Sequence, residues 1–515
     1  MKSMPRPIHE TRSDSEDQDG FFARVLTKLN SLWVSATYPF ARKGRNMSLH
    51  YGSEISRRLS PRIWLGDDIE IGRHSWLSMS TEWNNEINIT IEDNCRIGAR
   101  CTISAENSIH LKRGVVLGSD VLVIDSNHAY EDVSMPITQQ GFTPGGRIRI
   151  EEGCRIGNGA AILCDRGELV LGRNCIVAPG AVVTRSFPPN SLLSGNPARA
   201  VQGAGAALAS VQPVAERIPI ELGQETVRQG TDETGFVDSA LFASTRQHAS
   251  VKRPTTKEGS SVRGVTRYSQ QVMRDEDPLS WFSRAAIKLR TVWLAWTYPF
   301  ASFGRGAWVH YSCRVARSAA PYISLGEGVG FARGTRLDVC EAPGTDQPVL
   351  IMEDGSGMQR RGVISARNRV HVMKDVMFGF SVLVMDHVDS DDEDDFAGGQ
   401  KAEGGTIRIE EECWIGSGAM ILCEQGELVI GRHSVVGANS VVRRSIPPYS
   451  VVAGDPARIV KQYDFSKGKW VVGCIRPTAA ADRQQPDPPV NAAGEASTCE
   501  SAVPNSAGEV SRGVR

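Results

Sequence analysis

An aliphatic residue recurs at every sixth position through long stretches of this 515-residue chain, often with a Gly directly after it. A period of six fits neither an amphipathic helix nor a simple alternating strand. It is typical of short strands separated by turns, in which Gly, Asn or Asp adopts the left-handed conformation. Three such sides close a triangular coil, and stacked coils bury a continuous aliphatic column. The positions in the first half are Leu65, Ile71, Leu77, Ile91, Ile97, Ile103, Leu111, Leu117, Val123, Ile150, Ile156, Ile162, Leu171, Val177 and Val183.

The chain also repeats itself over a longer period of about 260 residues. The sequence Thr-Tyr-Pro-Phe-Ala at 37–41 returns at 297–301, and Ile-Arg-Ile-Glu-Glu at 148–152 returns at 407–411. The six-residue period returns as well, at Ile409, Ile415, Ile421, Ile430, Val436 and Val442. The pattern therefore predicts an all-β solenoid protein with two parallel β-helix domains in tandem.

A helical segment is expected before each β-helix. Phe22, Leu26, Leu29 and Trp33 lie on one face of a helix that Pro39 ends, and Phe282, Leu289 and Trp293 repeat this pattern. The aromatic face could contact a membrane surface. Packing against the coil or a neighbouring subunit is the more common outcome for such a face, and we expect it here.

Composition divides the rest of the chain. We expect a disordered segment at 1–20, a first domain at 21–202, a linker at 203–274, a second domain at 275–465 and a disordered tail at 478–515.

Charge and cysteine content exclude several classes of protein. With 58 basic and 59 acidic residues, the chain lacks the basic surplus that nucleic-acid binding needs. The eleven cysteines lack paired spacing, so we expect neither disulfides nor a metal site. Because no signal peptide and no apolar run long enough for a bilayer is visible, a cytoplasmic location is expected.

Three stretches carry a resemblance to a known family: Val-Ile-Asp-Ser-Asn-His at 123–128, Ile-Gly-Asn-Gly-Ala-Ala-Ile-Leu at 156–163, and 182–189 with Gly-Asn-Pro-Ala-Arg at 195–199. Together they resemble the hexapeptide-repeat acyltransferases, closest to the maltose, galactoside and surface-polysaccharide O-acetyltransferases. The resemblance implies left-handed β-helices, acetyl-CoA as co-substrate and a sugar hydroxyl as acceptor in surface-glycan assembly. It also implies a homo-oligomer with trimeric coil packing and active sites between adjacent coils.

Acyl transfer from a thioester to a hydroxyl needs a base, an oxyanion donor and a groove that aligns the substrates. His128 ends a regular strand and opens the one long loop of the first domain, 129–147. The resemblance implies that this His deprotonates the acceptor, and a near-neutral imidazole suits that work. Asp125 could orient the imidazole or serve as a turn residue.

The resemblance also implies a CoA site along the groove between neighbouring coils. Asn158 and Pro179 would border the pantetheine arm, Thr184 and Arg185 would meet the nucleotide, and Arg199 would reach phosphate. In the second copy, the matching basic positions are Arg444, Arg458 and Lys461.

The second copy differs at the base. His128 aligns with Asp389, which starts an acidic run at 389–395, and a His occurs instead at 387. We therefore expect that the first copy catalyses and that the second is a degenerate partner.

Two alternatives stay open at this point. One is a non-enzymatic β-helix scaffold. The other is a γ-class carbonic anhydrase, which shares the coil but needs three His around zinc. The first copy offers no HxxxxH pair near His128, which argues against the second alternative.

Overall fold

The computed structural model describes residues 21–79, 87–201, 280–339, 347–387 and 404–473. These described residues belong to one unit, which ends at Gly473. The segments that we expected to be disordered or linking, at 1–20, 203–274 and 478–515, lie outside the described residues. So does the acidic run at 389–395.

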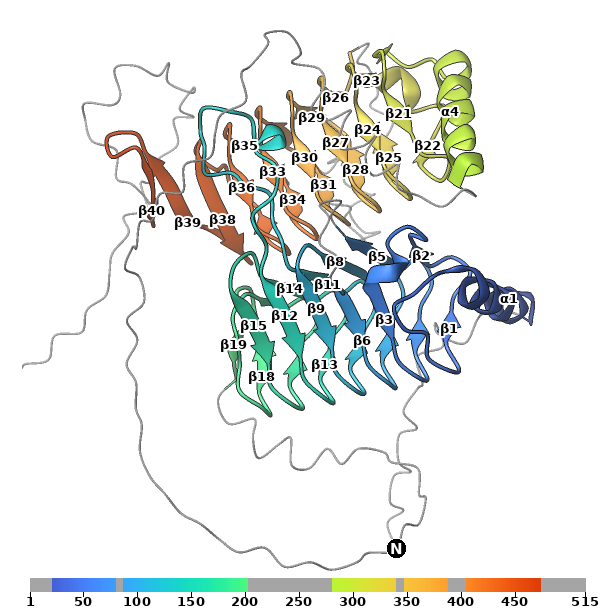
Figure 1. The fold of residues 1–515 in the computed structure, drawn as a ribbon. Helices are drawn as coiled ribbons and strands as arrows, with labels where there is room; N and C mark the ends of the chain where they lie inside the picture. Colours follow the sequence, from blue (N-terminus) through green and yellow to red (C-terminus); the bar gives the residue numbers. More distant parts are fainter. Residues whose placement is uncertain (1–20, 80–86, 202–279, 340–346, 388–403, 474–515) are drawn as a thin grey trace, which may run out of the picture. The chain divides into compact units, whose positions relative to one another are not determined.

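The described strands form two β-helices, which we call coil one (residues 48–200) and coil two (residues 302–472). Apart from the antiparallel strands that end each coil, each side of a coil is a parallel sheet in which a strand pairs with the strand one full turn away, as β6 (Ile89–Ile91) does with β9 (Ser108–Leu111) (Figure 1). The predicted fold, two parallel β-helices each preceded by a helix, is confirmed.

Coil one has three sheets, named here by their first strands. The β1 sheet contains β1 (Ser48–Leu49), β4 (Glu70–Ile71), β7 (Arg96–Ile97), β10 (Val116–Leu117), β13 (Arg155–Ile156), β16 (Ile176–Val177), β18 (Leu192–Ser194) and β19 (Arg199–Ala200). The β2 sheet contains β2 (Glu54–Ile55), β5 (Trp76–Met79), β8 (Thr102–Ala105), β11 (Leu122–Ile124), β14 (Ala161–Leu163) and β17 (Val182–Val183). The β3 sheet contains β3 (Ile63–Leu65), β6 (Ile89–Ile91), β9 (Ser108–Leu111), β12 (Arg147–Ile150) and β15 (Glu168–Leu171).

Coil two repeats this arrangement. Its β20 sheet contains β20 (Ser302–Phe303), β23 (Ile323–Leu325), β26 (Leu350–Met352), β29 (Arg369–Val372), β32 (Thr406–Ile409) and β35 (Glu427–Ile430). Its β21 sheet contains β21 (Trp308–Val309), β24 (Gly330–Phe331), β27 (Gly357–Met358), β30 (Met377–Phe378), β33 (Trp414–Ile415), β36 (Val435–Val436), β38 (Ser450–Gly454), β39 (Ala457–Asp464) and β40 (Lys469–Val472). Its β22 sheet contains β22 (Arg314–Val315), β25 (Arg336–Val339), β28 (Val363–Ala366), β31 (Leu383–Met385), β34 (Met420–Leu422) and β37 (Val441–Val442).

The aliphatic residues of the six-residue period form the core of each coil. Leu117 pairs in register with Ile97 on one side and with Ile156 on the other, and all three side chains are buried. Burial of each such side chain contributes roughly 1.5–3 kcal/mol. The Gly after the aliphatic residue is needed because successive turns touch: a Cβ on Gly98 would lie 2.5 Å from the carbonyl oxygen of Gly118.

The two predicted helices are present as α1 (Phe21–Thr37) and α4 (Ser280–Thr297), but their aromatic faces do not pack on the coil, the first of the two packing arrangements that we expected; the second, packing on a neighbouring subunit, stays a prediction. Leu29 and Trp33 of α1 are exposed, as are Leu289 and Trp293 of α4. Hydroxyl side chains instead attach each helix to the first strand of the β1 or β21 sheet. The coil end presents unpaired backbone groups, which a polar helix side satisfies better than an apolar one.

Coil one contacts coil two along its length. Near the start, the carboxylate of Glu54 pairs with Arg333 and with Arg360, whose Nη1 lies 2.6 Å from Oε2. Near the end, Asn439 Nδ2 donates to the carbonyls of Gly159 (2.7 Å) and Gly180 (3.2 Å). Residues near the start of coil one contact residues near the start of coil two, and residues near the two ends also contact each other. The two coils therefore run side by side in the same direction.

Coil two ends differently from coil one. Coil one closes with the short antiparallel pair β18–β19, whereas in coil two the equivalent strand continues as the long β39 and returns as β40. This hairpin extends to Val472, past position 465 where we expected the second domain to end.

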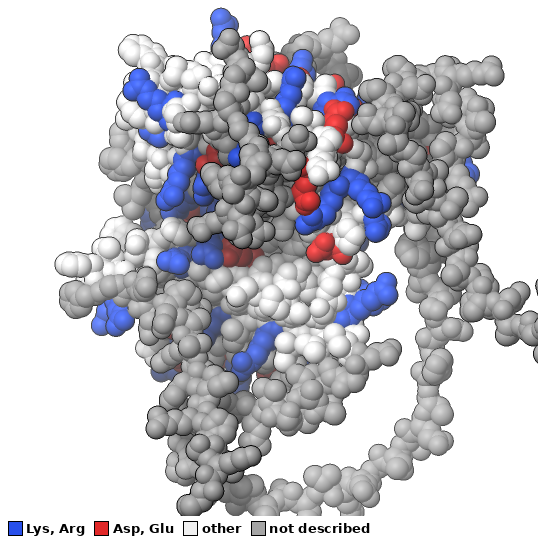
Figure 2. All heavy atoms as spheres, turned by 180° about the vertical axis from the view of Figure 1, so that it is seen from behind, with Lys and Arg blue, Asp and Glu red and all other residues white. Residues whose placement is uncertain are grey.

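No described helix is long and apolar enough to cross a membrane. On the face drawn in Figure 2, Lys and Arg side chains are interspersed with acidic and uncharged surface, and no continuous basic field covers the described residues there. This distribution agrees with the net charge of −1.

Candidate active site

The long loop of coil one leaves the β2 sheet after β11 and returns at β12. Two backbone hydrogen bonds close its base, from Thr143 N to Asn127 O (2.7 Å) and from Ala129 N to Gly141 O (3.0 Å). A short 3-10 turn, η2 (Ile137–Gln139), lies within it. These bonds hold His128 at the mouth of the loop.

The imidazole of His128 packs between an aromatic ring of its own loop and one of coil two. Its ring centroid lies 4.5 Å from that of Phe142 and 5.3 Å from that of Trp414, which meets it edge-on. Burial lowers the pKa of His128 to about 4, against a smaller raising effect of a hydrogen bond with the Gly141 backbone. The imidazole is therefore neutral at physiological pH, the form that a general base requires.

Asp125 is fully buried, and its carboxylate accepts hydrogen bonds from the backbone N–H groups of Glu106, Asn107 (2.9 Å) and Ser108 (2.8 Å). Asp386 of coil two accepts the same three bonds, from residues 367, 368 and 369. A bonding pattern kept in both coils fits the turn role better than a role in orienting His128. Burial raises the pKa of Asp125 despite these bonds.

Trp414 is the contact that sequence reasoning missed. It lies on β33, and the equivalent residue of coil one is Arg155 on β13. The sequence offered one signal for this contact: a Trp replaces an exposed Arg on the outer surface of an otherwise repeated coil. Only the pairing of the coils shows that this Trp meets His128.

The β39–β40 hairpin holds the same loop from another direction. Lys461 Nζ donates to the hydroxyl of Tyr130 (3.2 Å), and Trp470 Nε1 donates to the carbonyl of Glu131 (3.2 Å). The rings of Tyr130 and Trp470 meet edge-on at 5.5 Å. Lys461, predicted from the sequence as a CoA contact, is thus brought to the loop of coil one, two residues from the candidate base.

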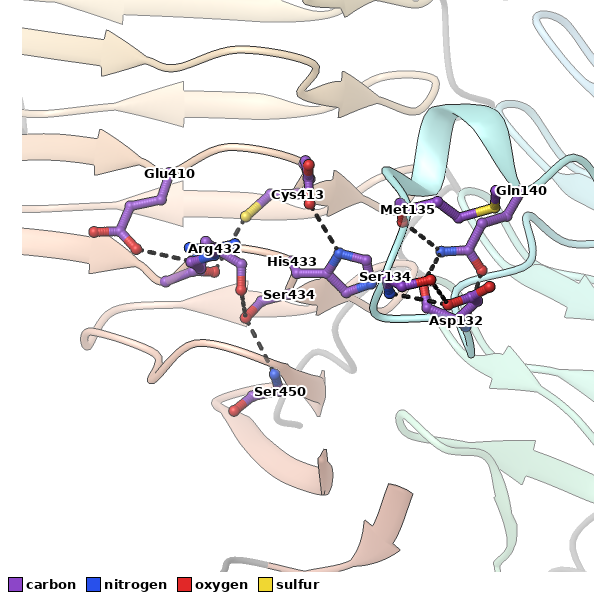
Figure 3. A network of polar contacts seen from close by, with 12 residues as sticks. Asp132, Ser134, Met135, Gln140, Glu410, Cys413, Arg432, His433, Ser434 and Ser450 are labelled. Atoms are coloured by element: carbon purple, nitrogen blue, oxygen red, sulfur yellow. Dashed lines mark hydrogen bonds and ion pairs between the residues drawn. The ribbon is translucent and has the colours of Figure 1, made fainter. Parts of the chain in front are cut away.

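A third contact region is shown in Figure 3. The imidazole of His433 points toward the loop segment that carries Asp132 and Ser134, while its Nδ1 lies 3.1 Å from Glu412 Oε2. The loop segment is itself fixed, because Asp132 Oδ1 accepts from Ser134 N (2.9 Å) and Gln140 Nε2 donates to the Asp132 carbonyl (2.7 Å). Coil two therefore contacts the loop at Trp414 and at the hairpin, and His433 interacts electrostatically with Asp132 of the loop.

The residues expected to border pantetheine lie at turns that face coil two. Asn158 Oδ1 accepts from Ser119 N (2.8 Å), which joins two successive turns. Gly159 and Gly180, directly after Asn158 and Pro179, are the acceptors for Asn439 of coil two. The structure thus brings Asn158 and Pro179 to the border between the coils.

The expected nucleotide contacts are all exposed, which suits a role at the surface: Thr184, Arg185, Arg199, Arg444 and Arg458. Arg185 stacks its guanidinium 5.2 Å from the Phe187 ring. The described contacts do not bring these residues to His128.

Coil two keeps a different His. His387 is buried, with Nδ1 2.9 Å from Asp386 Oδ1 and Nε2 3.5 Å from Ser365 Oγ. It occupies the position of Ser126, and Asp389, the residue aligned with His128, lies outside the described residues. The burial of His387 gives it a structural environment unlike that of His128.

The family described as "Hexapeptide repeat of succinyl-transferase" matches residues 88–123, 147–185 and 406–444, two regions in coil one and one in coil two. A putative lipopolysaccharide biosynthesis O-acetyl transferase, WbbJ of Escherichia coli, is 26% identical over 170 residues, or 32% of this chain and 82% of WbbJ. A probable acetyltransferase of Mycobacterium tuberculosis, Rv3034c, is 35% identical over 165 residues, 31% of this chain and 48% of its own length.

Solved structures that resemble the chain include AntD, an N-acyltransferase from Bacillus cereus in complex with dTDP and 3-hydroxybutyryl-CoA. It is 16% identical with a TM-score of 0.28, over 35% of this chain and 90% of AntD. The repeat matches in both coils and the acetyltransferase relatives agree with the observed architecture. The chain is therefore similar to the hexapeptide-repeat acyltransferases, and it carries the hexapeptide repeat in both coils.

Proposed function

We propose that the protein is an acetyl-CoA-dependent O-acetyltransferase that acts on a sugar hydroxyl in surface-glycan assembly, with His128 as general base. The observation that carries the proposal is the placement of a neutral imidazole at the mouth of an ordered loop, against the neighbouring coil. The O-acetyl chemistry and the glycan setting draw support from the similarity to the putative transferase WbbJ.

The reaction needs one proton to move twice. The unprotonated ring nitrogen of His128 takes the proton of the acceptor hydroxyl as its oxygen attacks the thioester carbonyl carbon. The C–S bond then breaks, and the imidazolium returns the proton to the departing CoA sulfur. One ester and one free thiol form, and His128 ends in its starting state.

The rings around His128 explain how a base with a pKa of about 4 can serve. A strongly buried imidazole is a weak base, but it is fully available at neutral pH and is shielded from water, which would otherwise compete for the acetyl group. Phe142 and Trp414 supply this shielding from two sides.

Coil two completes the site without a second base. Its contributions are Trp414 beside His128, the Lys461 and Trp470 contacts to the loop, and Asn439 at the turns next to Asn158 and Pro179. CoA would lie along this border, with Thr184, Arg185 and Arg199 of coil one or Arg444, Arg458 and Lys461 of coil two available to phosphate.

The test is release of free thiol from acetyl-CoA by purified protein, with a panel of sugars as acceptors. Activity with one acceptor class, and its loss in His128→Gln with acetyl-CoA binding retained, would support the proposal. The same thiol-release rate in His128→Gln would contradict His128 as base. Absence of acetyl-CoA binding to the wild-type protein would favour the scaffold alternative.

A further inference from the structure

We propose that α1 and α4 bind the surface of an anionic lipid bilayer, each through an apolar stripe that the fold leaves uncovered. This inference is independent of the proposed acyl transfer. It starts from the way the two helices are attached to their coils.

The stripe of α1 is formed by six apolar side chains that recur with helical spacing and are all exposed: Phe22, Val25, Leu26, Leu29, Leu32 and Trp33. Phe22 is 80% exposed and Trp33 is 55% exposed. In α4 the exposed members are Leu289, Val292, Trp293 and Trp296, of which Trp296 is 88% exposed. Spacings of three, four and seven place each set on one helix face.

The opposite side of each helix is the one that faces the coil, and polar side chains attach it to the first strand of a sheet. In α1, Ser31 Oγ accepts from Leu49 N (2.8 Å) and Asn30 Nδ2 donates to Leu49 O (3.1 Å). In α4, Thr291 Oγ1 accepts from Val309 N (3.1 Å). Val34 of α1 and Ile287 and Leu294 of α4 are buried apolar side chains. Each helix therefore leaves most of its large apolar side chains exposed, and this orientation is repeated in both coils.

The charges of the helices identify the partner. Residues 21–37 contain Arg24 and Lys28, residues 280–297 contain Arg284, Lys288 and Arg290, and neither segment contains an acidic residue. The guanidinium of Arg290 lies 4.5 Å from the ring of Trp293 at the border of the stripe. Apolar and Trp side chains bordered by basic residues alone match the interface of an anionic bilayer, where the rings enter the headgroup region and the cations meet phosphate.

A second copy of the chain is a poorer occupant for the same stripe. Pairing α1 with α1, or α1 with α4, would bring basic residues together without an acidic partner on either helix. The coils run in the same direction, so both helices lie at the same end of the paired coils. Two weak interfacial helices on one chain can bind a membrane together more strongly than either alone.

The experiment is vesicle flotation of the full-length protein with phosphatidylcholine vesicles, with and without about 30% phosphatidylglycerol. We expect binding to the anionic vesicles that weakens as salt is raised. Leu29→Gln with Trp33→Gln, or Leu289→Gln with Trp293→Gln, should lower the bound fraction several-fold, and all four changes together should lower it about tenfold or more.

Because these side chains are exposed, the variants should keep the wild-type thermal transition. Val472→Gln, which changes an 89% exposed apolar residue on β40, is the matched control and should bind as the wild type does. Failure of the wild type to float with anionic vesicles overturns the proposal, as does unchanged binding of the fourfold variant. A fourfold variant that loses only self-association would show that the stripes join copies of the chain instead.

Discussion

Coil one and coil two share a scaffold but differ where they meet. At equivalent positions coil one has Ala99 and Ser119, whereas coil two has Arg360 and Phe380. Both replacements contact Trp76 of coil one: Arg360 lies 4.4 Å over its ring, and Phe380 meets it edge-on at 5.7 Å. The second copy thus has Asp389 where the first has the proposed base, His128, and it has a surface that contacts the first. After a duplication, one unit can specialise in chemistry while the other specialises in completing its site.

The charges at the border favour the observed arrangement of the two coils over the one in which their roles are exchanged. Glu54 of coil one faces two Arg residues of coil two, whereas the equivalent of Glu54 in coil two is Arg314. With the roles of the coils exchanged, Arg314 would meet Arg73, the equivalent of Arg333. Like charges there would oppose the reverse arrangement, so the same residues that favour one pairing disfavour the other.

The largest expected effect separates the two histidines. His128→Ala should lower kcat/KM about 10²–10⁴-fold, because it removes the proton acceptor. His387→Ala should keep the activity per folded molecule but lower the free energy of unfolding by about 1–3 kcal/mol, because it leaves buried polar partners unsatisfied. Acetyl-transfer rates and denaturant unfolding measure the two. Equal loss of activity in both variants would break the assignment of chemistry to coil one.

The second effect concerns the border between the coils. Glu54→Ala should destabilise the pairing by about 1–3 kcal/mol, because it leaves Arg333 and Arg360 without their carboxylate. Arg314→Ala, at the equivalent exposed position of coil two, is the control and should have little effect. Unfolding in urea measures both variants, and similar values for the two would mean that the pairing is not directional.

The same contact predicts a pH dependence. Burial raises the pKa of Glu54, but Arg360 and Arg333 outweigh burial and hold the pKa below its ordinary value of 4.5. The contribution of the folded-state ion pair is therefore present above pH 4.5 and is lost as the pH falls through the lowered value. The wild type should lose more stability than Glu54→Gln over this acid range, as seen in thermal unfolding curves.

A smaller effect is expected at Trp414. In the wild type, kcat/KM should stay level from neutral pH to about pH 5 and fall only as His128 protonates near its pKa of about 4. Trp414→Ala exposes the imidazole of His128 to water, so the pKa of His128 should rise toward 6.5. The pH at which kcat/KM begins to fall should rise with it. At pH 7 the rate should fall about 3–10-fold. Arg155→Ala in coil one should leave the profile in place, and a shift in both variants would argue against a specific contact.

The smallest effect is expected at the hairpin. Tyr130→Phe or Lys461→Ala removes one exposed contact, worth about 0.5–1 kcal/mol, and should change KM about 2–5-fold with little change in kcat. Lys469→Ala, also exposed on the hairpin, is the control. A large fall in kcat in either loop variant would show that the hairpin takes part in the chemistry.

Local sequence was enough to predict the coil and the candidate base. The six-residue period, the Gly after each aliphatic residue and the long loop after His128 are properties of neighbouring residues, so they can be read without knowing what lies across the molecule. Arg360 was visible in the sequence too, but its role was not. Arg360 is explained only by Glu54 and Trp76, which lie in the other coil.

The orientation of the two helices is another feature that local sequence could not predict. Their spacing correctly predicted two amphipathic helices, but it did not tell which face meets the coil, because the face is chosen by the unpaired backbone of the first strand and not by the helix itself. By itself the sequence determined the two β-helices, the resemblance to the hexapeptide-repeat acyltransferases and the residue proposed as base, because all three depend on residues that are close together in the chain. Only the tertiary structure decided that Trp414, Lys461 and Trp470 meet the loop of coil one, because those contacts join residues hundreds of positions apart.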